Sequence, residues 1–235
     1  MKIAIMQPYF FPYLGYLALI KHSDLFIFFD TPQFIRHGWI ERNRILKPEE
    51  GWQYIKVPLE KHSRGISIKE IMILSTDDWK EKIIAQLAHY KKRAPFYNET
   101  LNIIMQTLDF STTSITRLNV FALEKVFNYL NLNFEYKIFS EMDLKIKTPE
   151  EPDEWALNIT KELKANIYIN PPGGENFFNK KKFENENIKL YFLKIKLSEY
   201  NQRRKTFEPG LSIIDVLMFN SPEKICNMLD DFILE

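Results

Sequence analysis

Hydrophobic residues at the start of the chain form two short runs separated by a helical pattern. The first run, Ile3–Met6, stops before Pro8, and the second covers Leu25–Phe29. Apolar runs of this length, bounded by turn residues, are typical of buried strands. Between them, Leu14–His22 has the residue spacing of a helix. A strand, a helix and a second strand in this order predict a βαβ unit with a parallel strand pair.

The middle of the chain changes from a strand-like pattern to helical periodicity. Residues 31–43 mix polar and aromatic residues without a regular period, and we expect them to be irregular. The segment Gln53–Pro58 alternates and stops at a proline, which is typical of a half-exposed strand. Three helices are predicted after it, at about residues 77–92, 95–108 and 113–131.

The C-terminal part returns to alternating strands and helices. Strands are predicted at residues 134–139, 166–170 and 190–195, and helices at residues 153–164, 211–219 and 222–234. Strands at both ends of a chain with helices between them are typical of layered α/β folds. The sequence therefore predicts an α/β fold with a Rossmann-like, mostly parallel sheet and a central helical insertion at about 77–131, in a single domain over residues 1–235.

The composition restricts the class of protein. With 45% hydrophobic residues the chain can form a large core, and its net charge of +1 argues against broad nucleic-acid binding. Cys226 is the only cysteine, and the four histidines are scattered, so neither an intrachain disulfide nor a metal site is predicted. No apolar stretch has the length of a membrane span or the form of a secretory leader. We therefore expect a cytoplasmic protein that does not enter a membrane.

Chemistry-bearing residues are concentrated first in the loop after the first strand. Open α/β sheets bind ligands at the carboxyl ends of their strands, and this loop starts there. Gln7, Tyr9 and Tyr16 are the candidate substrate-binding residues, because a polar amide at a strand end needs partners and tyrosines offer a flat face with a hydroxyl. The alternative is that the tyrosines only cover the edge of the sheet.

The second concentration follows the second predicted strand. Asp30 ends that strand, so we expect it to point into the same crevice as Gln7 and to act in catalysis. Arg42 has the planar fork that clamps a phosphate or carboxylate; Arg36 and Arg44 are alternatives. The candidate substrate-binding residues of this segment are Gln33, His37, Trp39, Arg42 and Asn43. For Trp39, a role as a core anchor is the structural alternative.

The third concentration lies near the C-terminus. Tyr200, Gln202 and Ser212 are candidate substrate-binding residues, and Asp215 is the second candidate catalytic carboxylate. A structural reading also exists, because Ser212 could cap the helix that starts there and Asp215 in its first turn would suit the helix dipole. We expect these residues to share one crevice with Gln7 and Asp30.

Blocks of sequence that span nearly the whole chain resemble the WbqC-like protein family. The resemblance begins with Met6-Gln7-Pro8-Tyr9, Pro12 and Gly15-Tyr16. It continues through Asp24, Asp30, Gln33-Phe34, Trp39, Arg42-Asn43-Arg44-Ile45, Tyr168, Gly173-Gly174, Phe183, Tyr200, Gln202, Phe207-Glu208-Pro209 and Leu211-Ser212-Ile213-Ile214-Asp215. This family is known chiefly from gene clusters for surface polysaccharides, including O-antigen.

The resemblance implies a transferase of O-antigen biosynthesis that adds glycine, or another small acyl or aminoacyl unit, to a nucleotide-linked amino sugar. An acyl-adenylate route would need ATP with Mg²⁺ and a phosphate clamp, for which Arg42, Arg44 or Lys56 are candidates. A carrier-bound or tRNA-bound glycine donor would remove that need. The first alternative function is a non-catalytic accessory protein that binds a sugar or nucleotide.

The second alternative is a nucleotidylyltransferase-like enzyme. The order of strand, proline-containing loop, Leu14-Gly15-Tyr16-Leu17, helix and Asp24 is similar to the opening of that superfamily. There, two histidines of the loop stabilise the charge on an ATP phosphate. Tyr13 and Tyr16 stand near those places here, and a neutral tyrosine does not supply the positive charge of an imidazolium. This difference argues against ordinary nucleotidyl transfer.

Overall fold

A six-stranded, mostly parallel sheet forms the centre of the protein in the computed structural model, which describes residues 1–75 and 78–235. The strand order is β5-β2-β1-β6-β7-β8, and within the described part of this sheet only the β7–β8 pair is antiparallel. The strands are β1 (Lys2–Met6), β2 (Leu25–Phe28), β5 (Tyr136–Ile138), β6 (Ile167–Asn170), β7 (Lys189–Ile195) and β8 (Phe232–Leu234). The predicted α/β class with a mostly parallel sheet is confirmed.

Helices cover both faces of this sheet. Side chains of a strand point alternately to its two faces: Ile3 and Ile5 of β1 join one buried cluster, and Ala4 joins the other. The first cluster includes residues of α5 (Glu154–Glu162) and α6 (Lys180–Asn185). On the other face, α1 (Leu14–Lys21) packs against β7 and α8 (Pro222–Asp230).

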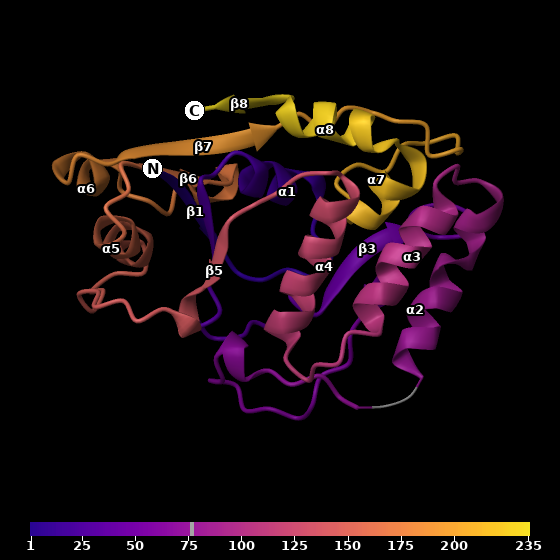
Figure 1. The fold of residues 1–235 in the computed structure, drawn as a ribbon, viewed down its shortest axis with the longest axis horizontal. Coiled ribbons are helices and arrows are strands. Elements are labelled where there is room, and N and C mark those ends of the chain that lie inside the picture. The colour runs from indigo at the N-terminus through magenta and orange to yellow at the C-terminus, as the bar shows by residue number, and fades with distance from the viewer. Residues whose placement is uncertain (76–77) are drawn as a thin grey trace.

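The rest of the chain forms a second, largely helical part beside the sheet (Figure 1). It contains the antiparallel pair β3 (Arg42–Leu46) and β4 (Trp52–Lys56) together with α2 (Trp79–Leu87), α3 (Tyr97–Leu108), α4 (Ile115–Tyr129) and α7 (Ile213–Phe219). Short 3-10 turns are η1 (Ile68–Glu70), η2 (Ala88–Lys92), η3 (Phe139–Glu141) and η4 (Pro172–Gly174). The helices α2 to α4 lie between β4 and β5 in the sequence, where the helical insertion was predicted.

Two predictions of local structure are corrected. The irregular segment ends two residues earlier than expected, because Arg42 already pairs with Lys56 at the start of β3. The last helix stops at Asp230 instead of continuing to residue 234, because Phe232–Leu234 pair with the end of β7. A short apolar segment such as this one fits either a helix or a strand, and it forms a strand here because the edge of β7 is open for pairing. The predicted helix start at residue 77 lies outside the described residues.

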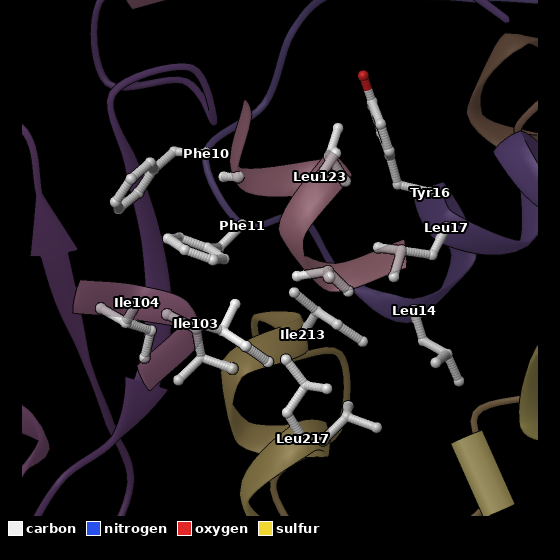
Figure 2. Packing of buried hydrophobic residues seen from close by; sticks show 14 of the residues in the cluster. Phe10, Phe11, Leu14, Tyr16, Leu17, Ile103, Ile104, Leu123, Ile213 and Leu217 are labelled. Carbon is white, nitrogen blue, oxygen red and sulfur yellow. The ribbon is translucent and has the colours of Figure 1, made fainter. Parts of the chain in front are cut away.

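The largest buried cluster joins the loop after β1 to the helical part. Figure 2 shows Phe10 and Phe11 of this loop beside Ile103 and Ile104 of α3, with Leu217 of α7 nearby. Both phenylalanines are almost completely buried. The loop is therefore inserted between the two parts of the protein, and its position depends on both.

Candidate functional site

A cleft with a volume of about 790 Å³ lies at the carboxyl ends of β1, β2 and β6. Segments 5–9, 29–35, 152–156, 168–170 and 177–178 contribute its walls. This is the edge of the sheet at which parallel α/β folds bind ligands. Its volume is that of a small-molecule site, and it is the largest of the described pockets.

Three of the predicted substrate-binding residues line this cleft: Gln7, Tyr9 and Gln33. The Gln33 amide donates to the backbone oxygen of Arg64 at 2.6 Å, whereas the side-chain amide of Gln7 has no hydrogen bond within residues 1–75 and 78–235. The hydroxyl oxygen of Thr31, which also lines the cleft, is buried without a partner in the same ranges. Unpaired polar groups in a concave site are those a ligand can bind.

The sequence interpretation missed the opposite wall of the cleft. Trp155, Tyr168, Asn170 and Phe178 line it. The Asn170 side chain is already bonded, because its oxygen accepts from the Tyr168 hydroxyl at 2.9 Å and its nitrogen donates to the Pro171 oxygen at 3.0 Å. Asn170 ends a third parallel strand, so the rule that pointed to Gln7 could have pointed to it as well.

The cleft is aromatic and uncharged. Rings of Tyr9, Phe29, Trp155, Phe177 and Phe178 form much of its surface, and none of the described residues that line it has a charged side chain. Flat apolar rings with a few neutral amides and hydroxyls suit a sugar ring or a nucleobase. Neither the cations that a triphosphate needs nor the carboxylates that Mg²⁺ prefers are present among these residues, so ATP with Mg²⁺ does not fit here.

The loop that carries Gln7 and Tyr9 is held by hydrogen bonds to its backbone oxygens. The Tyr16 hydroxyl donates to the oxygen of Gln7 at 2.8 Å, and the Asn119 amide of α4 donates to the oxygen of Pro8 at 2.9 Å. Burial raises the pKa of Tyr16 well above its ordinary value, so its hydroxyl remains a donor. Tyr16 is 1% exposed; it positions the loop and does not reach a ligand.

Two further predicted residues hold the next turn of the same loop. Asn43 donates to the oxygens of Phe10 at 3.0 Å and Phe11 at 2.9 Å, and the Ser212 hydroxyl donates to the Phe11 oxygen at 2.7 Å. Phe11 has a left-handed backbone, with φ of 40°, which is costly for a non-glycine residue and persists only where the surroundings fix it. Ser212 also accepts from the Ile214 amide as the N-cap of α7, as the structural reading anticipated.

A second pocket of about 320 Å³ adjoins the cleft, and Tyr9 lines both. Trp39, Asn43 and Arg44 line it as well. The Arg44 guanidinium lies over the rings of Trp39 at 5.4 Å and Trp52 at 5.2 Å, and it donates to the Gly210 oxygen at 3.0 Å. Trp39 is 38% exposed, so it is not a core anchor. An arginine held against aromatic rings is a suitable partner for an anionic group.

Arg42 is directed away from both pockets. Its guanidinium stacks on the ring of Tyr54 at 4.0 Å and donates to the backbone oxygens of Gly38 and His37. The prediction that Arg42 clamps a ligand phosphate is not supported by this geometry, whereas Arg44 lies at a pocket. His37 is exposed and lies outside the cleft, in a separate pocket that Lys56 also lines.

Asp30 does not point into the cleft, so that prediction is wrong. The residue is 2% exposed, and its two carboxylate oxygens accept from the backbone nitrogen of Ser140 at 3.0 Å and from the Ser140 hydroxyl at 2.7 Å. Both bonds join the end of β2 to η3, beyond β5. Asp30 therefore fixes the sheet edge from inside, and its burial keeps its carboxylate away from a substrate in the cleft.

Asp215 is at the centre of a buried cluster remote from the cleft lining. Its carboxylate accepts from the hydroxyls of Tyr90 at 2.7 Å and Tyr200 at 2.6 Å and from the Gln202 amide at 2.9 Å. Asp215 is 0% exposed. Burial raises its pKa to about 6, and the three hydrogen bonds oppose that rise. Burial and the neighbouring carboxylate raise the pKa of both tyrosines well above the ordinary value.

The shared crevice predicted for Gln7, Asp30 and Gln202 is not formed. Gln202 is 3% exposed and exchanges two bonds with the backbone of Glu208, so it fixes the C-terminal loop. Tyr90 connects the Asp215 cluster to β3, because its hydroxyl accepts from the backbone nitrogen of Leu46 at 2.9 Å. The cluster joins α7, β3 and this loop.

Residues 1–75 and 78–235 contain no group of three histidine, cysteine or acidic side chains arranged to hold a metal ion. None of the helices in these ranges combines the length and the apolar character needed to cross a bilayer.

Comparison with known proteins gives a family and a distant relative. The model of the WbqC-like protein family matches residues 7–227. The uncharacterized protein Rv1507c of Mycobacterium tuberculosis is 28% identical over 221 residues, which cover 93% of this chain and 93% of the relative. No solved structure matches the chain. The match starts at Gln7, the first residue of the loop between β1 and α1, which the hydrogen bonds described above hold in place (the clamped loop).

Proposed function

The chain belongs to the WbqC-like protein family, and we propose that it is a transferase of bacterial surface polysaccharide (O-antigen) biosynthesis. It adds glycine, or another small acyl or aminoacyl unit, to the amine of a nucleotide-linked amino sugar. The observation that carries this proposal is the neutral aromatic cleft at the carboxyl ends of β1, β2 and β6. A sugar is recognised by stacking on flat rings and by hydrogen bonds to amides and hydroxyls, and the cleft offers both.

The two adjoining pockets support an acceptor with a neutral part and an anionic part. The sugar occupies the cleft, where the Gln7 amide and the Thr31 hydroxyl have no hydrogen-bond partner among residues 1–75 and 78–235. The diphosphate extends past Tyr9, which lines both pockets, toward Arg44. The planar guanidinium of Arg44 suits a phosphate oxygen.

The chemical step is an aminolysis. The donor is an activated acyl unit, such as the ester of a glycyl-tRNA or a glycyl-adenylate. The amine nitrogen of the sugar forms a bond to the acyl carbon while the bond from that carbon to the ester or phosphate oxygen breaks, and the amine proton passes to that oxygen. The protein contributes mainly position, because holding two reactants in an attack geometry removes much of the entropic barrier. The clamped loop supports this role, since its bonded backbone oxygens keep Gln7 and Tyr9 in one place.

Mass spectrometry tests the proposal directly. The protein is incubated with a panel of nucleotide-linked amino sugars and either glycine with ATP or glycyl-tRNA, and the products are examined for a glycyl adduct. We expect an adduct with one acceptor, and at least a tenfold lower rate for Gln7→Leu. Exposed Gln106→Leu in α3 is the matched control. The absence of an adduct under both donor conditions would contradict the proposal.

A second candidate function is a non-catalytic accessory protein that binds a sugar or nucleotide in the same pathway. The observation in its favour is that none of the described residues lining the cleft is charged, so no general base stands there. Calorimetry separates the two functions. Micromolar binding of one acceptor without turnover, under every donor condition above, would favour the accessory role.

A further inference from the structure

A pocket separate from the cleft surrounds a buried carboxylate, Glu41. It has a volume of about 310 Å³. Glu41 immediately precedes β3 and is 2% exposed, although its side chain lines the pocket. One carboxylate oxygen accepts from the backbone nitrogen of His37 at 3.0 Å. The other oxygen is buried and has no hydrogen-bond partner within residues 1–75 and 78–235.

The free oxygen of Glu41 is an unusual feature. An ionised carboxylate withdrawn from water is stable only with donors or a countercharge. Arg36, Lys56 and Lys61 line the same pocket, yet none of them forms an ion pair with Glu41 in the described part of the chain. The carboxylate can therefore accept a hydrogen bond from a donor that the described residues do not supply. The three cations are not paired with this carboxylate and can bind an anion.

This pocket lies on the other side of the segment that walls the cleft. Gln33 and Ile35 line the cleft, whereas Phe34 and Arg36 line the pocket around Glu41. Alternate residues of an extended segment point to opposite sides, so one thickness of backbone separates the two cavities. The pocket is thus a neighbour of the proposed acceptor site.

We infer that the pocket around Glu41 binds an amino acid as a zwitterion. Its ammonium group donates to the free carboxylate oxygen of Glu41, and its carboxylate pairs with the cations at the rim. Glu60 also lines the pocket, so three cations face one carboxylate besides Glu41 and leave a net positive charge for the carboxylate of the ligand. A ligand with both charges suits both parts of the pocket. Metal binding is not favoured, because the described residues provide no set of three suitable ligands. The inference rests on the proposed function for the class of ligand, an amino acid, and it places that ligand behind the cleft wall, apart from the transfer step. Binding is therefore measured without any acceptor.

Calorimetry and thermal denaturation with the twenty standard amino acids, starting with glycine, test this inference on the full chain. We expect at least one of them to bind and to raise the melting temperature. N,N,N-trimethylglycine, which has no ammonium hydrogens, should bind at least tenfold more weakly than glycine if glycine is the ligand. Acetate and methylamine, each with one charge, should not bind measurably. Failure of all twenty amino acids to bind would overturn the inference.

Matched variants locate the binding. Glu41→Gln should weaken it at least tenfold, and Lys56→Gln several-fold, while the exposed residues of the β3–β4 turn provide the controls Glu50→Gln and Lys47→Gln. Melting of Glu41→Gln without ligand checks that the variant folds. Unchanged affinity in Glu41→Gln would also overturn the inference. Glycyl transfer from tRNA without amino-acid binding would contradict this binding site but not the proposed function. Amino-acid binding without transfer to any acceptor would contradict the proposed function but not this binding site.

Discussion

The cleft and the Asp215 cluster differ in whether their polar groups have hydrogen-bond partners within the protein. In the cluster, a carboxylate that is 0% exposed receives three donors, from Tyr90, Tyr200 and Gln202. In the cleft, the Gln7 amide has no partner among the described residues, and the surface around it is aromatic. Polar groups that are satisfied internally stabilise the fold, whereas unsatisfied groups in a cavity are available to a ligand.

This difference separates two kinds of residue within the blocks that resemble the family. Tyr16, Asn43 and Ser212 direct their polar atoms at the backbone of the loop that precedes α1. Gln7 and Tyr9 are on that loop and line the cleft. The first group holds the loop in place, and the second group forms the surface of the cleft. Four changes, ordered by the size of the expected effect, test this division.

Removal of the central acceptor should have the largest effect. Asp215→Ala leaves two hydroxyls and an amide buried without their acceptor, and each costs about 1–3 kcal/mol. We expect a loss of about 4 kcal/mol in the free energy of unfolding, measured with urea. Asp109→Ala, at an exposed carboxylate, should change it by less than about 0.5 kcal/mol. Equal values for the two variants would remove the distinction.

The pH dependence of stability should show the same carboxyl. The folded pKa of Asp215 is raised from 3.8 to about 6 by burial, so the fold favours the protonated form. The resulting stabilisation is present below pH 3.8 and is lost as the pH rises through 6; it amounts to about 3 kcal/mol. Urea unfolding between pH 3.5 and 7.5 measures it. Asp215→Asn should lose this component, and an unchanged profile in that variant would contradict the assignment.

Loss of the loop clamp should have an intermediate effect. Asn43→Ala removes the donor to Phe10 and the second donor to Phe11, whose oxygen keeps the bond from Ser212. We expect about 2 kcal/mol of destabilisation, together with weaker acceptor binding, because the loop also walls the cleft. The control is Asn102→Ala, at an exposed position of α3. Acceptor affinity at the wild-type level would show that the clamp does not serve the cleft.

Changes on the cleft surface should affect stability least and ligand binding most. Phe177 lines the cleft and is 52% exposed. Phe177→Ser should alter the free energy of unfolding by less than about 0.5 kcal/mol but weaken acceptor binding about tenfold, as measured by calorimetry. Met105→Ser, at a similarly exposed apolar residue of α3, should change neither. A loss of stability without a loss of binding would place Phe177 with the scaffold.

The sequence predicted the sheet and the location of the cleft because both follow from short-range patterns. Apolar runs mark the strands, and parallel strands end at a common edge, which placed Gln7 and Tyr9 correctly. Side-chain direction beyond a strand end does not follow from such patterns. Asp30 turns inward because Ser140 offers two donors, and that contact joins residues 110 positions apart.

The remaining errors have the same origin in distant contacts. β8 forms because the edge of β7 is open to it, although its own residues also fit a helix. Gln202 and Asp215 were recognised as related, but their partner Tyr90 lies in the helical insertion and had no distinguishing pattern. Glu41 was missed because a charged residue beside an irregular segment is ordinarily solvated. Only its burial distinguishes it.

The clamp on the loop after β1 also sets an order of assembly. Its donors come from Tyr16, Asn43, Asn119 and Ser212, and a ribosome makes the chain from the N-terminus onward. The loop does not have all of its donors until Ser212 is synthesised, some two hundred residues after the loop itself. Until then Phe10 and Phe11 lack part of their burial against α7. The wall of the cleft is among the first segments to be synthesised and among the last to be completed.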